Sequence, residues 1–183
     1  LRKALAKLRE QGVLESRQGS GNYVTRNSSD ASIYALFRLE RVDGGGLPRA
    51  RVLAVDKLQK PPELPGLEGA TEAHRIRRLR LLDDQIVAAE EIWLDSRWAE
   101  HLDPANLSES LYLSFREKLG LLIAGTEDRV GVSQMPAWGK DTGCDPGALC
   151  GHFSRLGRTA DGQYPESSQT WFNSERACYV ARR

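Results

Sequence analysis

The chain has 183 residues, a length that suits one to one and a half domains. Hydrophobic residues make up 40% and charged residues 28%, an ordinary globular composition, and no apolar run reaches the roughly 18 residues that a membrane-spanning helix needs. The first segment is charged and amphipathic, unlike a signal peptide, and three cysteines are typical of a reducing compartment. We therefore expect a cytoplasmic protein that does not contact a membrane.

Charge is unevenly distributed along the chain. The first 26 residues carry six Arg or Lys side chains against two Glu, whereas the remainder is mildly acidic. A basic end suggests contact with a polyanion, but short surface helices are often basic without such a partner. The chain starts with Leu1 and its single methionine is Met135, so we expect an N-terminally truncated protein.

The N-terminal elements are predicted from apolar spacing and glycines. Residues 1–11 have the periodicity of an amphipathic helix, and Gly12 provides its C-terminal stop. Two short β-rich segments, 13–17 and 23–25, flank a glycine-rich connection, which predicts a hairpin. A helix followed by a hairpin, with cations on both, is typical of the second half of a winged helix-turn-helix.

The remainder has mostly a strand pattern. Strands are expected at residues 33–42, 50–58, 74–82, 86–95, 121–132, 148–158 and 166–173. Ser108 is the expected N-cap of a helix that continues to Lys118, with Leu111 and Phe115 on its buried side. Many strands joined by hairpins and few helices predict an α+β fold, an antiparallel sheet with packed helices.

The N-terminal run resembles the end of the winged helix of GntR-family regulators. The matching positions are Arg2, Ala4, Leu5, Leu8, Gly12, Leu14, Gly19, Gly21, Tyr23 and Val24. The resemblance implies that residues 1–26 are a partial winged helix-turn-helix, namely the end of the recognition helix and the wing, and that residues 27–31 are a linker.

The same resemblance implies DNA contacts. Arg2 and Lys3 would lie on the recognition helix, in the major groove of a DNA operator. Four wing residues would approach the DNA backbone: Arg17, Gln18, Gly19 and Gly21. The alternative interpretation is a hairpin with solvated cations.

Residues 32–183 resemble the UTRA domain, the effector-binding module of the HutC branch. The resemblance rests on residues 77–84, 88–91, 110–112 and 166–172. It implies a fold similar to chorismate lyase, in which helices pack on an antiparallel sheet, and a homodimer.

Two arginines are the first candidates for an effector site. Arg78 and Arg80 are two residues apart on a predicted strand, so both project from one face and could bind a phosphate or carboxylate. A two-residue turn at 83–84 would put Glu91 on that face, and a three-residue turn would put Glu90 there. The family spacing favours Glu90. The alternative is a solvated strand face with surface ion pairs of little energetic value.

The resemblance places four more residues around the effector: Ser110, Tyr112, Glu166 and Phe172. Ser110 and Tyr112 begin the predicted helix, where backbone N–H groups and the helix dipole favour an anion. Phe172 stands where many relatives have tyrosine, so one hydrogen-bond donor is expected to be lost.

Other chemistry finds little support in the sequence. Cys144, Cys150 and His152 lack a usual zinc spacing, so neither a metal nor another cofactor is expected. The sequence contains no nucleophile elbow, P-loop or metalloprotease motif, and no arrangement that looks like a catalytic dyad with an orienting third group. The expected function is a DNA-binding transcription regulator, repressor or activator, whose C-terminal domain binds a small anionic effector. The alternatives are a chorismate-lyase-like enzyme acting on a small anionic substrate, and a remnant sensor without DNA binding. The winged-helix segment favours the regulator, because a lyase has no need of it.

Overall fold

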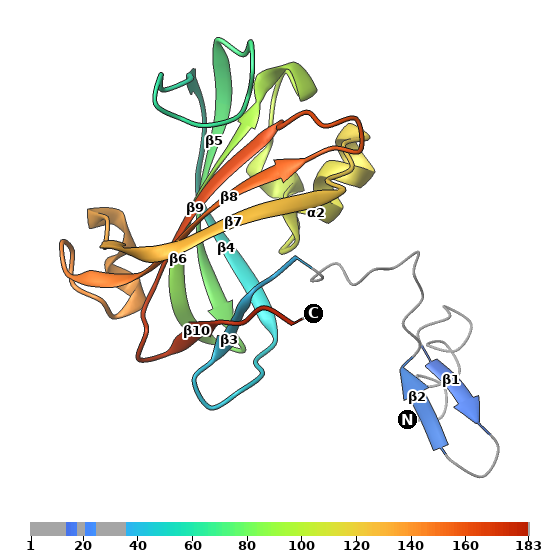
Figure 1. Ribbon diagram of the computed structural model, residues 1–183, viewed down its shortest axis with the longest axis vertical. Helices are drawn as coiled ribbons and strands as arrows, with labels where there is room; N and C mark the ends of the chain where they lie inside the picture. Colours follow the sequence, from blue (N-terminus) through green and yellow to red (C-terminus); the bar gives the residue numbers. More distant parts are fainter. Residues whose placement is uncertain (1–13, 18–20, 25–35, 183) are drawn as a thin grey trace. The chain divides into compact units, whose positions relative to one another are not determined.

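The computed structural model describes residues 14–17, 21–24 and 36–182, and the chain divides into two compact units, Leu1–Leu36 and Phe37–Arg183. In the first unit, β1 (Leu14–Arg17) and β2 (Gly21–Val24) pair antiparallel, with Arg17 opposite Gly21 (Figure 1). The predicted hairpin is therefore confirmed. The expected helix at residues 1–11 and the linker at 27–31 lie outside the described residues.

The second unit is built on one antiparallel sheet of six strands. Their spatial order is β4-β5-β6-β9-β8-β7, so β4 and β7 form the edges. The bounds are β4 (Pro48–Gln59), β5 (Glu72–Leu82), β6 (Gln85–Asp95), β7 (Gly125–Gln134), β8 (Leu149–Arg158) and β9 (Glu166–Phe172). This sheet with few helices confirms the predicted α+β fold.

A small second sheet joins the two ends of this unit. β3 (Leu39–Arg41) pairs antiparallel with β10 (Ala177–Tyr179), and Figure 1 shows the two strands side by side. Of the strand expected over 33–42, the described part forms a strand only at β3. No strand is predicted from the sequence after residue 173, so β10 is a departure from the prediction; its three residues are too few to show an alternating pattern.

The helical segments are short. They are η1 (Ser96–Trp98), η2 (Pro104–Asn106), α2 (Leu111–Ser114), a π-helical turn η3 (Phe115–Leu119) and η4 (Ala137–Thr142). No helix of the described part is long and apolar enough to cross a bilayer.

The predicted N-cap of the main helix is wrong by two residues. The Ser110 hydroxyl accepts a hydrogen bond from the Leu113 N–H at 3.4 Å, so Ser110 is the N-cap of α2. The Ser108 hydroxyl instead lies 2.8 Å from Ser114 Oγ and donates to the Ser110 carbonyl at 2.6 Å. Ser108 thus closes the loop before the helix and does not cap it.

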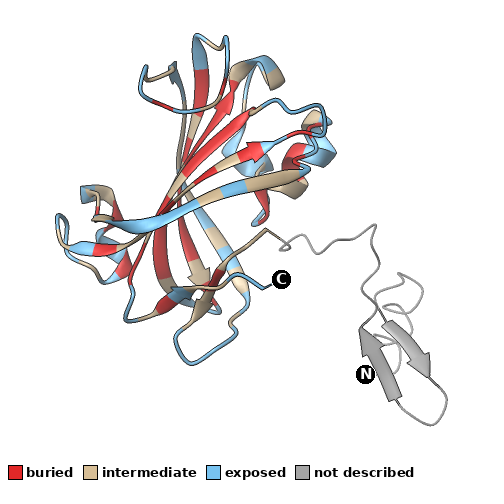
Figure 2. Ribbon diagram, in the orientation of Figure 1, coloured by how far each residue is buried: buried red, intermediate tan, exposed pale blue. Residues whose placement is uncertain are grey.

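Both faces of the sheet are covered, and Figure 2 shows buried residues along its central strands. One face packs against the small sheet through an apolar cluster that includes Leu39, Phe153 and Phe172. The other face carries a second cluster around Leu79, Ala89 and Met135. Because both faces are covered, the central strands β5 and β6 contain runs of consecutive buried residues.

Candidate functional site

The β5–β6 hairpin decides which glutamate faces the two arginines. Leu82 lies opposite Gln85, so the turn has two residues, and the simple alternation would then select Glu91. The register shifts at Val87, which is unpaired between Ile86 and Ala88. This β-bulge adds one residue to β6 and brings Glu90 opposite Arg78. Glu90 therefore lies on the expected face, although for a reason other than a three-residue turn.

We call the side of the sheet that carries Arg78 and Arg80 the arginine face. Arg78 Nε donates to the Glu90 carboxylate, and Arg80 Nη1 lies 4.0 Å from the same Oε2 atom. Both guanidinium groups also donate to the Glu109 carbonyl, at 3.3 and 3.2 Å. The two arginine side chains are only 7% and 5% exposed, so the alternative of a solvated strand face is wrong here.

The charge of Glu90 is maintained by these neighbours. Burial would raise the pKa of the Glu90 carboxyl, but the guanidinium groups of Arg78 and Arg80 outweigh it and hold the pKa below its usual value. Glu90 is therefore ionised at neutral pH. One carboxylate thus faces two guanidinium groups in a nearly dry environment.

Phe37 covers Arg80, a contact that the sequence analysis missed. The guanidinium carbon of Arg80 lies 4.5 Å from the centroid of the Phe37 ring, within the range of a cation–π interaction. Phe37 is the first residue of the second unit. The aromatic residue within the β-rich segment 33–42 was the available signal, but nothing in that segment indicates which surface the ring covers.

Glu166 and Tyr112 form a second polar contact between α2 and the sheet. The Tyr112 hydroxyl donates to Glu166 Oε2 at 3.1 Å, and Glu166 is 1% exposed. Burial raises the pKa of Glu166 to about 7, even though the Ser168 hydroxyl, the charge of Arg155 and the Tyr112 hydroxyl oppose the rise. Burial, with the charge of Glu166, also raises the pKa of Tyr112. Glu166 is the buried acid of this site that titrates near neutrality.

Arg155 on β8 is a third buried arginine that the sequence analysis did not select. The register places it on the arginine face, opposite Ser168 and Asp128. Its Nε and Nη2 atoms each donate to an Asp128 carboxylate oxygen at 2.6 Å, and the Tyr179 hydroxyl donates to Asp128 at 2.7 Å. Alternation along residues 148–158 would have indicated the face on which Arg155 lies. Its partner Asp128 could not be found in this way, because it belongs to the adjacent strand β7.

Thr170 and Phe172 extend the same face along β9. Thr170 lies opposite Glu90, and its hydroxyl is buried without a hydrogen-bond partner among the described residues. Phe172 lies opposite Gly151, where a Cβ atom would come within 2.2 Å of its ring. Buried polar atoms are rarely left unsatisfied, so the Thr170 hydroxyl is an indicator of a site.

The structure thus brings the seven predicted effector residues to one side of the sheet. Arg78, Arg80 and Glu90 form one group, and Tyr112 with Glu166 forms another. Ser110 is buried and caps α2, while Phe172 is part of the apolar cluster. The described part of the chain contains no group of three or more His, Cys, Asp or Glu side chains suited to a metal ion.

The predicted DNA-contact residues are described only in part. Arg17 lies in β1 and Gly21 in β2, opposite each other in the hairpin. Arg2, Lys3, Gln18 and Gly19 lie outside the described residues.

Comparison with known proteins gives a consistent result. Residues 43–177 match the UTRA domain. The chain is 46% identical over all its 183 residues to the HTH-type transcriptional regulator SmoD of Agrobacterium fabrum (strain C58 / ATCC 33970), and covers 78% of that protein.

Solved structures share the fold at low sequence identity. A ligand-binding domain from Bordetella bronchiseptica has a TM-score of 0.71 at 19% identity, covering 80% of this chain and 96% of that one. PhnF of Mycobacterium smegmatis has a TM-score of 0.63 at 20% identity, covering 100% of this chain and 83% of that one. A GntR-family regulator from Enterococcus faecalis V583 has a TM-score of 0.63 at 14% identity, over 73% of this chain and 99% of that one. The match over most of its length, together with this fold, shows that the chain belongs to the UTRA-domain family.

Proposed function

We propose that the protein is a transcription regulator of the GntR type, HutC branch, in which the UTRA domain binds a small anionic effector and thereby modulates binding to a DNA operator. The 46% identical relative is named an HTH-type transcriptional regulator, which supports the general role and favours it over the lyase alternative. The antiparallel hairpin, with Arg17 on its first strand, supports a wing at residues 14–24.

The observation that carries the effector proposal is the group of Arg78, Arg80 and Glu90. Guanidinium groups are costly to bury, and two of them lie together here on one face, beside the Glu90 carboxylate. A phosphate or carboxylate matches the fork of hydrogen-bond donors that a guanidinium offers. We therefore assign the charged part of the effector to these arginines.

Neutral polar groups on the same face suit the remainder of the effector. The Thr170 hydroxyl, opposite Glu90, can donate to or accept from a ligand hydroxyl. Glu90 itself can accept from such a hydroxyl. The expected effector class is thus a small phosphorylated or carboxylated compound that also carries hydroxyl groups.

We also propose that the protein is a homodimer that pairs through β7. This edge strand exposes Val130 by 56% and Val132 by 75%. Edge strands are usually protected by lysine or proline, and residues 130–134 contain neither. In sedimentation velocity, Val132→Lys should shift the protein toward monomer. Val42→Lys, a change at another exposed valine, should leave the dimer unchanged. Equal behaviour of the two variants would contradict pairing through β7.

The effector proposal is tested by a thermal-shift screen of small phosphorylated sugars and carboxylates. Arg80→Ala should abolish the rise in melting temperature that a binding anion causes in the wild type, because only native-state binding stabilises the fold. Arg77→Ala is the matched control: Arg77 lies on the same strand but pairs with Glu91 on the opposite face. If Arg80→Ala and Arg77→Ala respond to anions alike, the arginine face is not the effector site.

A further inference from the structure

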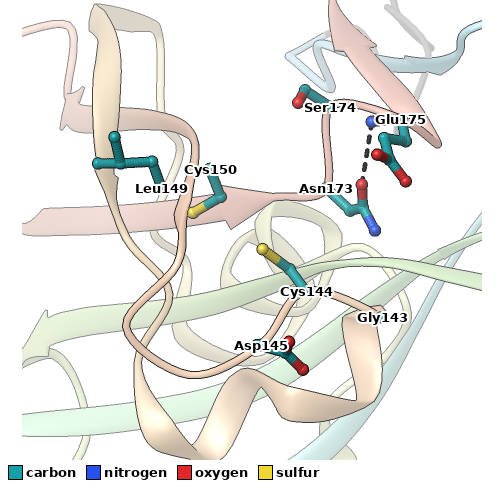
Figure 3. Close-up of a pocket in the computed structure, with 8 residues that line it drawn as sticks. All are labelled: Gly143, Cys144, Asp145, Leu149, Cys150, Asn173, Ser174 and Glu175. Atoms are coloured by element: carbon teal, nitrogen blue, oxygen red, sulfur yellow. Dashed lines mark hydrogen bonds between the residues drawn. The ribbon is translucent and has the colours of Figure 1, made fainter.

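Two cysteines lie close together on the face of the sheet opposite the arginine face. Cys144 follows η4, and Cys150 is the second residue of β8. Both residues line the same cavity, and Figure 3 shows the sulfur atom of Cys144 directed toward Cys150. Both side chains belong to the apolar cluster around Met135. Packing in this cluster therefore holds both cysteines, one on each side of the loop that connects η4 to β8.

A cavity of about 200 Å³ adjoins both cysteines. Cys144 is half-buried and Cys150 is buried, so a reagent in the cavity reaches Cys144 first. Asp145 and Glu175 also line the cavity and give it an acidic rim (Figure 3). The space suits a small molecule that carries positive charge.

We propose that Cys144 and Cys150 form a thiol–disulfide exchange site, which reduces small amine-bearing disulfides and closes to an intramolecular disulfide. In the first step, the Cys144 thiolate attacks one sulfur of the reagent R–S–S–R, forms a mixed disulfide and releases one R–S⁻. In the second step, the Cys150 thiolate attacks Cys144 Sγ, forms the Cys144–Cys150 bond and releases the second R–S⁻. The reagent is reduced to two thiols, which take up the two protons lost by the cysteines.

The order of the two steps follows from the surroundings of each thiol. Burial, together with the neighbouring Cys144, raises the pKa of Cys150 to about 11, so Cys150 is a poor first nucleophile. Once Cys144 carries the mixed disulfide, Cys150 is the thiol that lines the same cavity, and proximity favours the intramolecular attack.

Local structure permits closure. The connecting loop turns between Asp145 and Ala148, with a hydrogen bond of 3.0 Å, and Gly147 has a φ of +81° that other residues rarely adopt. Cys150 gives up one weak hydrogen bond to the Ser133 carbonyl, at 3.3 Å. Disulfide formation therefore costs Cys150 this one weak hydrogen bond.

The test uses the 183-residue chain with Cys178→Ser, which removes the exposed third thiol, and cystamine as the reagent. Intact mass should fall by two hydrogens without retained cysteamine, and peptide mapping should find Cys144 joined to Cys150. With Cys150→Ala added, one cysteamine should remain on Cys144. With Cys144→Ala added instead, the reaction should slow by about tenfold or more, because the remaining thiol is buried.

Several results would overturn the proposal. Two separate mixed disulfides, or a reaction that occurs only in urea, would show that the thiols do not act as a pair in the folded protein. Oxidised glutathione, which is anionic, should react more slowly than cystamine, and an equal rate would remove the assigned preference for amines. The product mass of the Cys178→Ser chain, which keeps Cys144 and Cys150, shows whether an intramolecular disulfide forms. This result does not depend on whether a variant at Cys144 or Cys150 folds.

Discussion

Glu90→Gln tests the charge arrangement of the arginine face directly. The substitution keeps the size and shape of the side chain but removes the negative charge of Glu90, which faces Arg78 and Arg80. The Glu90 side chain is 15% exposed and the two arginine side chains 7% and 5%, so water can compensate only a little. The folded state should therefore lose stability, and added anion should restore part of it.

The magnitude follows from the geometry. At 4.0 Å, the separation of Arg80 Nη1 and Glu90 Oε2, two unit charges interact by about 4 kcal/mol at an effective dielectric constant of about 20. Removing one partner of a buried ion pair typically costs about 3–5 kcal/mol. Because the amide of Gln can still accept a hydrogen bond from Arg78, we expect a loss of about 3 kcal/mol in the free energy of unfolding.

Urea unfolding with and without inorganic phosphate, at constant ionic strength, measures both effects. Phosphate at about 100 times its dissociation constant adds about 2.7 kcal/mol to the native state. It should do so at a lower concentration for Glu90→Gln than for the wild type, in which it must approach the Glu90 carboxylate.

Glu91→Gln is the matched control for this experiment. Glu91 lies on the same strand, pairs with Arg77 at 2.6 Å on the opposite face, and also accepts a hydrogen bond from Trp93 Nε1 at 2.9 Å. Its loss should lower stability and leave the phosphate response as it is in the wild type. If phosphate stabilises Glu90→Gln and Glu91→Gln equally, or stabilises neither, the reasoning about the arginine face is refuted.

Three further predictions follow from the packing of the same face. Because burial raises the pKa of Glu166 from 4.5 to about 7, its contribution to stability is full below about pH 4.5 and is lost as pH rises toward 7. Glu166→Gln should remove this dependence, on the order of 3 kcal/mol, from unfolding curves at pH 5–8; an unchanged slope would contradict the assignment. Gly151→Ala should cost about 1–3 kcal/mol in urea unfolding, because its methyl group meets the Phe172 ring, whereas Gly131→Ala on β7, with nothing within 4 Å, should cost clearly less. Phe37→Ala should weaken phosphate binding by exposing the guanidinium that the ring covers, and Phe37→Leu should retain the packing but lose about 0.5–2 kcal/mol of cation–π energy; equal phosphate titrations for both variants and the wild type would argue against a role for this ring.

The arginine face was predictable in outline because it depends on strand alternation. Arg78 and Arg80 share a face in any strand, whatever surrounds it. The choice of Glu90 was less secure, because one residue of register exchanges it with Glu91. The bulge at Val87 decides the register, and a buried valine in a β-rich run has no sequence mark of a bulge.

The parts that were missed depend on contacts between distant segments. Arg155 and Asp128 lie on adjacent strands 27 residues apart, and each is ordinary in its own strand. Phe37, the first residue of the second unit, contacts Arg80, which lies in β5 and is distant in the sequence. Periodicity and capping report local structure only, so such pairs become visible once the strand order β4-β5-β6-β9-β8-β7 is known.

The two missed contacts have a common consequence for regulation. Phe37 precedes β3 and stacks on Arg80, while Tyr179 in β10 donates to Asp128, the partner of Arg155. Tyr179 in β10 and Phe37, which lies just before β3, therefore both contact charged residues of the arginine face. We propose that an anion bound at Arg80 changes the charge under the Phe37 ring, so that its binding free energy is coupled to the position of the segment that leads into β3. We propose that this coupling is the route by which the effector alters DNA binding, because β3 is the first strand of the second unit. The coupling is reciprocal, so operator DNA should shift the phosphate affinity by the same factor as phosphate shifts the affinity for DNA.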